Sequence, residues 1–116
     1  MIDDETKYSI EEVIELCKTC PIKVISRQKT IDFLNESSKD FDSIKDEVTK
    51  LRVENACADP ELDYGENRKG YVYQFKKLVF EKYWCYIKVK IKVNLNRIVV
   101  VISFHKEDYD YVYKQN

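Results

Sequence analysis

A strict alternation of side chains over residues 83–93 constrains the fold more than any other feature of the chain. In an extended strand, successive side chains point to opposite faces of a sheet. One face of this segment would carry only apolar side chains, namely Cys85, Ile87, Val89, Ile91 and Val93. The other would carry Trp84, Tyr86, Lys88, Lys90 and Lys92. The pattern predicts a strand with one buried face and one aromatic, cationic face.

Two more strands are predicted, one before and one after this segment along the chain. Residues 71–80 are rich in aromatic and β-branched side chains, and residues 98–104 form an apolar run typical of a central strand covered on both faces. The turn-forming residues 94–96 predict a hairpin, which makes the last two strands antiparallel neighbours. The stretch 59–70 contains Pro and Gly and is expected to be a surface loop.

The N-terminal half has helical periodicity instead. Ser9 and Glu12 have the spacing of a capping box, which predicts a helix that begins there and ends before Pro21. Residues 22–25 are expected to form an edge strand, and residues 30–35 a brief helical turn.

A second amphipathic helix is predicted after Asp40. Its apolar residues recur at steps of three or four and share one face, namely Phe41, Ile44, Val48 and Leu51. The sequence therefore predicts a single α+β domain over residues 1–116, in which N-terminal helices pack on one face of a small, mainly antiparallel β-sheet.

The formal net charge of −1 conceals a division along the chain. Residues 1–67 carry 9 basic and 17 acidic side chains, a charge of −8, whereas residues 68–106 carry 10 basic side chains and one acidic side chain, a charge of +9. Such asymmetry points to a polyanionic partner such as RNA. The alternative is that the two halves neutralise each other within one fold.

The cationic face predicted for residues 83–93 suits RNA, because aromatic rings stack on bases and ammonium groups meet phosphates. The preceding loop and strand add further positive charge. The predicted RNA-binding residues are Arg68, Lys69, Lys76, Lys77, Trp84, Lys90 and Lys92. A solvated outer face, whose lysines prevent pairing with other strands, is the alternative.

His105 is the only histidine of the chain and follows the last predicted strand. An imidazole exchanges a proton near neutral pH, so His105 at the rim of the cationic face is a candidate acid or base. A structural or merely exposed histidine is the alternative.

The four cysteines are few and irregularly spaced, and the pair Cys17 and Cys20 has no second pair at metal-ligand spacing. We therefore expect reduced thiols, no metal site and no cofactor.

The acidic N-terminus is unlike a secretory signal, and no apolar run approaches the roughly 18 residues that a membrane span needs. A cytoplasmic protein without membrane contact is expected.

Two short motifs carry a family resemblance. Residues 86–89 (Tyr-Ile-Lys-Val) and residues 101–105 (Val-Ile-Ser-Phe-His), followed by Glu107, Asp108 and Tyr109, resemble the C-terminal signature of MqsR-type toxins in the RelE-like group. Upstream segments resemble the family's opening helix, its basic segment with a short helix, and its second helix, over residues 9–16, 27–34 and 41–53 respectively.

The resemblance implies a RelE/MqsR-like fold and the toxin of a type II toxin–antitoxin system. Such a toxin is a metal-independent endoribonuclease, which cuts mRNA by attack of a 2′-hydroxyl on the adjacent phosphate and is blocked by a cognate antitoxin protein. The assembly implied is a homodimer or a toxin–antitoxin hetero-oligomer. A non-catalytic RNA-binding or protein-binding module on the same fold is the alternative.

Carried over onto this sequence, the family's catalytic residues correspond to Tyr86, Lys88 and His105, and to Gln74 if the alignment admits a gap of one residue. The family's upstream lysine has no counterpart in residues 55–59, so Lys76 or Lys77 is expected to substitute for it. The tyrosine-rich tail, residues 107–116, is expected to form either a further strand of the sheet or a strand that binds a partner.

Overall fold

The computed structural model describes residues 5–63 and 69–107, and within these ranges it contains three α-helices, one short 3₁₀ helix and five strands. The helices are α1 (Ile10–Thr19), α2 (Gln28–Ser37), α3 (Phe41–Thr49) and the 3₁₀ helix η1 (Val53–Asn55). The strands are β1 (Ile22–Val24), β2 (Glu61–Leu62), β3 (Tyr71–Val79), β4 (Tyr83–Asn94) and β5 (Asn96–Lys106). The expected α+β class is confirmed.

The first helix begins at the predicted capping box. The Ser9 hydroxyl accepts a hydrogen bond from the Glu12 amide at 3.1 Å, and the Glu12 carboxylate accepts one from the Ser9 amide at 3.2 Å. Two backbone donors that the helix leaves unpaired are thus satisfied. Pro21 follows the end of the helix, as expected. The buried side of α1 consists of Val13, Ile14, Leu16 and Cys17.

The next two helices differ from the prediction in length and in one core residue. The helical turn expected over residues 30–35 extends to the ten residues of α2. Asp40 caps α3 by accepting a hydrogen bond from the Ser43 amide at 2.9 Å. Ile44 and Val48 are buried as predicted, but Phe41 is 37% exposed, because it lies in the first turn and beyond the edge of the core.

The strands form one mixed sheet, in the order β1-β5-β4-β3-β2 within the described residues. Strands β3, β4 and β5 form the expected antiparallel meander. Strand β1 is the expected edge strand, but it pairs with β5 in parallel, from Ile22 opposite Val99 to Val24 opposite Val101. The predicted loop 59–70 contains the short strand β2, which pairs with the start of β3, while residues 64–68 lie outside the described residues.

A tight turn joins β3 to β4, one residue earlier than predicted. Phe80 and Glu81 both have positive φ, at 51° and 59°, and the Lys82 amide donates to the Val79 carbonyl at 3.0 Å. This is the geometry of a type I′ hairpin turn. Such a backbone is uncommon for phenylalanine, and here the Phe80 ring stacks on Phe33 of α2 with centroids 6.0 Å apart.

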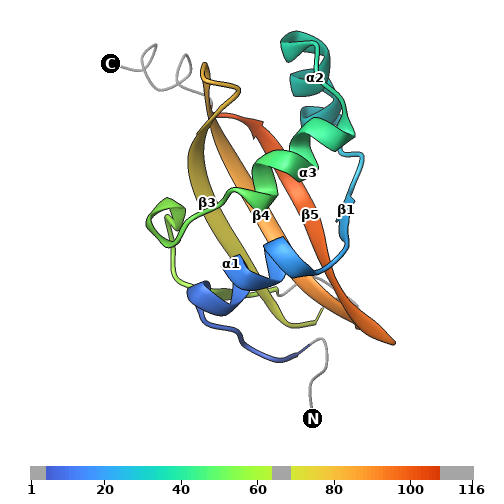
Figure 1. The fold of residues 1–116 in the computed structure, drawn as a ribbon, viewed down its shortest axis with the longest axis vertical. Helices are drawn as coiled ribbons and strands as arrows, with labels where there is room; N and C mark the ends of the chain where they lie inside the picture. The colour runs from blue at the N-terminus through green and yellow to red at the C-terminus, as the bar shows by residue number, and fades with distance from the viewer. Residues whose placement is uncertain (1–4, 64–68, 108–116) are drawn as a thin grey trace.

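All three helices lie on one side of the sheet (Figure 1). We call this side the helix face. Its inward side chains pack with the helices into the main core, which includes Tyr73, Phe75, Cys85, Ile87, Val89, Ile91, Val99, Val101 and Phe104. The alternation predicted for residues 85–91 is therefore confirmed on its apolar side.

The opposite side of the sheet, which we call the open face, is not covered by any helix of the described residues (Figure 1). It carries a small apolar cluster of Val72, Val100 and Ile102, all at most 9% exposed. Strand β5 is thus buried on both faces as predicted, although the strand at the centre of the sheet is β4.

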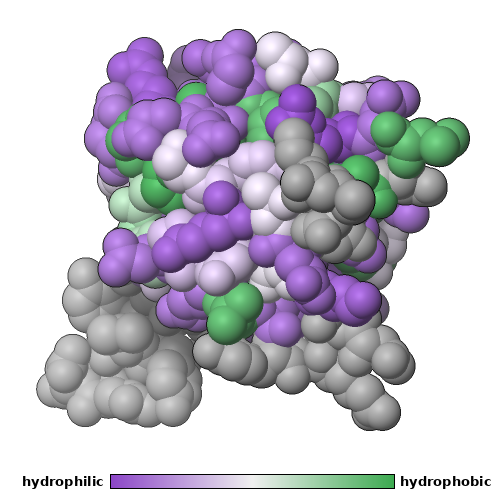
Figure 2. All heavy atoms as spheres, turned by 90° about the horizontal axis from the view of Figure 1, so that it is seen from below, coloured by the Kyte–Doolittle hydropathy of each residue, from purple (hydrophilic) through white to green (hydrophobic). Residues whose placement is uncertain are grey.

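Seen from the lower end of the molecule, the surface is mainly hydrophilic, with hydrophobic residues in separate spots (Figure 2). No helix of the described part of the chain has the length and the apolar character that a membrane crossing demands.

Candidate functional site

Three predicted functional side chains form one row across the open face. In the register of the sheet, Tyr86 of β4 lies between Lys76 of β3 and His105 of β5. The Tyr86 and His105 rings have centroids 6.4 Å apart, and the Lys76 ammonium lies 5.3 Å from the centroid of the Tyr86 ring. The strands therefore bring a phenol, an imidazole and an ammonium group together.

A β-bulge gives His105 its position. The register between β4 and β5 shifts so that Lys88 pairs with Ser103 while Val89 pairs with Val101, which leaves Ile102 as the extra residue. Simple alternation from Val100 would turn the imidazole to the helix face. The bulge resets the alternation, so that His105 shares the open face with Tyr86. We predicted His105 just beyond the last strand, whereas it lies within β5.

The hydrogen bond made by the imidazole determines which of its nitrogens can take up a proton. His105 Nδ1 lies 3.0 Å from the backbone carbonyl oxygen of Lys106. A carbonyl oxygen can only accept a hydrogen bond, so Nδ1 carries the proton and, in the neutral ring, Nε2 has a lone pair. Behind the ring lies a pocket of about 200 Å³, which is also lined by Asp32 and Glu36 of α2.

A second row lies next to the first on the same face. Lys88 of β4 pairs with Gln74 of β3 on one side and with Ser103 of β5 on the other. The Arg27 guanidinium donates a hydrogen bond from Nη1 to the Ser103 hydroxyl at 3.3 Å. The four predicted catalytic residues, Gln74, Tyr86, Lys88 and His105, therefore occupy two adjacent rows.

Arg27 is a site residue that we did not identify from the sequence. It follows β1, and the Ile25 amide continues the pairing of β1 by donating to the Val101 carbonyl at 2.9 Å. The parallel pairing with β5 thus brings Arg27 beside Ser103. Recognising residues 22–25 as the parallel neighbour of the last strand would have indicated this position.

Two of the predicted RNA-binding lysines on the open face already bind carboxylates. Lys90, only 5% exposed, pairs with Asp63 at 3.1 Å. Lys76 forms an ion pair with Glu107. Lys92 and Trp84 are exposed. In the described part of the chain, no carboxylate lies within 4 Å of Lys88, Lys92 or Arg27. Lys88, Lys92 and Arg27 are therefore cations of the open face that are available to a ligand.

Lys77 does not lie on this face, so the structure does not bring it together with the other predicted RNA-binding residues. Its neighbour in register is Cys85, whose thiol is in the core, so its side chain points to the helix face. There it pairs with the Glu47 carboxylate of α3 at 2.9 Å.

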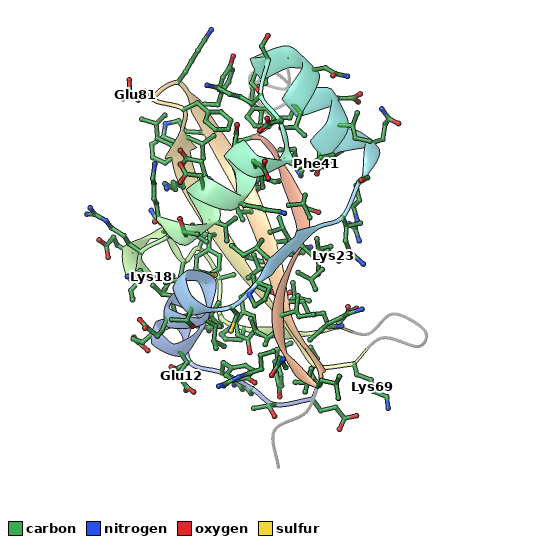
Figure 3. The ribbon with its side chains drawn as sticks, turned by 45° about the vertical axis from the view of Figure 1, so that its right-hand side comes forward. Glu12, Lys18, Lys23, Phe41, Lys69 and Glu81 are labelled. Atoms are coloured by element: carbon green, nitrogen blue, oxygen red, sulfur yellow. The ribbon has the colours of Figure 1, made fainter. Side chains whose placement is uncertain are left out.

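Lys69 is exposed just before β3 (Figure 3). Arg68 lies outside the described residues, as does the tail from residue 108 onward.

The segment that lacks the family's upstream lysine runs beside β3. Ala56 bridges Phe75, and the Cys57 amide donates to the Gln74 carbonyl at 3.1 Å. Of the two lysines considered as substitutes, only Lys76 lies on the open face.

The cysteines show no sign of a reactive centre. Cys17 and Cys85 are buried in the core, and burial raises the pKa of each thiol to about 12. The described residues contain no cluster of three or more His, Cys, Asp or Glu side chains that could hold a metal ion.

Comparison of the chain with protein-family models, with curated proteins and with solved structures finds no match. The relation to MqsR-type toxins therefore rests on the sequence motifs alone.

Proposed function

We propose that the protein is an RNA-cleaving toxin of the MqsR type, within the RelE-like group, and that its open face is the active surface. In this proposal mRNA is the substrate, a cognate antitoxin protein blocks the open face, and the protein acts in the cytoplasm. The observation that carries the proposal is the pairing of Tyr86 with His105 beside Lys88 and Arg27. This arrangement combines proton-transfer groups with cations that no described carboxylate neutralises.

The proposed reaction uses each group in a distinct role. His105 Nε2 accepts the proton of a ribose 2′-hydroxyl, and the resulting oxygen attacks the adjacent phosphorus. Lys88 and Arg27 stabilise the negative charge that develops on the phosphate oxygens. The Tyr86 hydroxyl protonates the departing 5′-oxygen, so that one product ends in a 2′,3′-cyclic phosphate and the other in a 5′-hydroxyl. None of these steps needs a metal ion.

Lys76 and Gln74 have supporting roles in this proposal. The Lys76 ammonium lies over the Tyr86 ring, 5.3 Å from its centroid, and helps to hold the ring in place on the open face. Gln74 lies beside Lys88 in the sheet and offers an amide that can bind a phosphate or ribose oxygen.

The test is incubation of the purified protein with a long single-stranded RNA in the presence of EDTA. We expect discrete fragments with cyclic phosphate ends. His105→Ala and Tyr86→Phe should each slow cleavage by about 100-fold or more, because each removes a proton-transfer group. Tyr83→Phe is the matched control, since Tyr83 lies on β4 but packs against Phe33 on the helix face, and it should cut at the wild-type rate. Equal cleavage by all variants, or no cleavage by the wild type, would overturn the proposal.

The ion pairs on the open face favour a second candidate. Asp63 and Glu107 already bind Lys90 and Lys76, which leaves fewer cations for a substrate. A protein that binds RNA, or an acidic partner protein, without cutting it fits this charge distribution. RNA binding without fragments in the same assay would support this second candidate.

A further inference from the structure

A pocket of about 270 Å³ adjoins the second row of the candidate site, on the side away from His105. Its floor is the apolar cluster of the open face, Val72, Val100 and Ile102. Its other lining residues are Ile25, Arg27, Asp63, Lys88, Lys90 and Lys92. The pocket therefore combines an apolar floor with a cationic rim.

The charge of the rim is uneven. Arg27 and Lys88 lie at the end near the catalytic rows, and they have no carboxylate within 4 Å in the described part of the chain. On the β3 side, Asp63 neutralises Lys90. Arg27 and Lys88 therefore attract a phosphate group more strongly than the neutralised Lys90–Asp63 pair does. A ligand with one anionic end and one uncharged end fits this distribution.

The floor defines the uncharged end. Val72, Lys90 and Val100 are neighbours in register across three strands, so the floor is a flat patch of the sheet. Ile102, the bulged residue, extends this patch toward Ser103. A planar ring that covers the patch makes van der Waals contact with these side chains, which are at most 9% exposed, and covers the little apolar surface that they leave in water. A nucleobase has this shape.

The position relative to the catalytic rows identifies the ligand further. Along β4, Lys88 follows Tyr86 by two residues, a rise of about 7 Å. Lys92 lies beyond it on β4, and Lys23, opposite Val100 on the edge strand β1, faces the same side (Figure 3). A polynucleotide that reaches the Tyr86–His105 pair would thus continue over the pocket.

We propose that this pocket binds one nucleotide of the RNA next to the cleaved bond, with its phosphate on Arg27 and Lys88 and its base on Val72, Val100 and Ile102. The inference rests on the proposed function, because it takes RNA as the ligand of the open face. It adds a base-binding subsite that the sequence motifs do not assign.

The test is a methyl-detected NMR titration of the full-length protein with adenosine 3′-monophosphate and uridine 3′-monophosphate. Inorganic phosphate and the two nucleosides are titrated separately. We expect a nucleotide to shift the methyl signals of Val72, Val100 and Ile102 and to bind more tightly than phosphate or nucleoside alone. Arg27→Ala should weaken nucleotide binding by about tenfold or more, because it removes a charge-assisted hydrogen bond. Lys18→Ala on α1 is the matched control and should bind as the wild type does.

The outcomes separate this inference from the proposed function. The His105→Ala variant should keep the nucleotide-induced methyl shifts while it loses cleavage. Methyl signals that do not respond to either nucleotide, in a wild-type protein that cuts RNA, would overturn the pocket and leave the proposed function standing. Phosphate that binds as tightly as the nucleotides would also overturn it. Methyl shifts in a wild-type protein that does not cut RNA would support the pocket and overturn the nuclease.

Discussion

Two rows of the same three strands, one on each face of the sheet, differ in how their lysines are paired. On the helix face, the row Lys77–Cys85–Lys106 has both lysines bound to helix carboxylates, Glu47 of α3 and Glu36 of α2. On the open face, the row that contains Lys88 has no such partner among the described residues.

The ion pairs change how we interpret the difference in charge between the acidic N-terminal half and the basic segment that follows it. The acidic N-terminal half does neutralise part of the basic half, because Glu36, Glu47 and Asp63 bind three of its lysines. On the open face, Arg27, Lys88 and Lys92 have no such carboxylate partner in the described part of the chain. Internal neutralisation therefore occurs on both faces of the sheet, and the proposed anionic partner concerns only the cations of the open face that have no such carboxylate.

Breaking the helix face should have the largest effect on stability. Phe104 of β5 is fully buried on the helix face, where its ring packs against Phe33 of α2. Phe104→Ala should lower the free energy of unfolding by about 3–5 kcal/mol, because it leaves a cavity in the core. Leu95→Ala, at a turn residue that is 99% exposed, should change it by less than about 0.5 kcal/mol. Urea denaturation measures both, and equal losses would contradict the assignment of the core.

Replacing one lysine on each face by alanine tests whether the lysines of the two faces have different roles. Lys77→Ala should cost about 1–3 kcal/mol of stability, because it leaves the largely buried Glu47 carboxylate without its ammonium partner. Lys88→Ala should change stability by less than about 0.5 kcal/mol and should weaken RNA binding instead. Denaturation and RNA-binding curves for both variants would refute the division of roles if Lys88→Ala proved the more destabilising change.

The smallest expected effect is a difference in reactivity between the buried thiol of Cys85 and the exposed thiol of Cys57. Burial holds the pKa of Cys85 on the helix face at about 12, whereas Cys57 is exposed. Iodoacetamide at about pH 8 should therefore modify Cys57 well before Cys85, as followed by mass spectrometry. Because folding raises the thiol pKa from 9.0, this group's contribution to stability should decline as the pH rises from 9.0 toward about 12. Rapid labelling of Cys85 in the folded protein would show that the helix layer does not protect it.

The sequence predicted those features that depend on local patterns. The capping box at Ser9 and the alternation along β4 depend on neighbouring residues, and both are present. The prediction failed where distant segments meet. The parallel pairing of β1 with β5 positions Arg27, and the bulge at Ile102 turns His105 to the open face. Alternation along β3 places Lys76 and Lys77 on opposite faces, whereas the ion pair of Lys77 with Glu47, 30 residues away, could not be predicted from local patterns.

The central claim is that the open face binds RNA. It is tested most directly by fluorescence anisotropy with a cleavage-resistant 2′-O-methyl RNA over a range of salt concentrations. With Arg27, Lys88 and Lys92 as phosphate-binding groups, the logarithm of the affinity should fall with the logarithm of salt concentration with a slope of about −2. Lys88→Glu should weaken binding by about tenfold or more, while Lys18→Glu on α1 should change it by less than about twofold. Equal weakening by the two variants, or binding that does not depend on salt, would contradict the account.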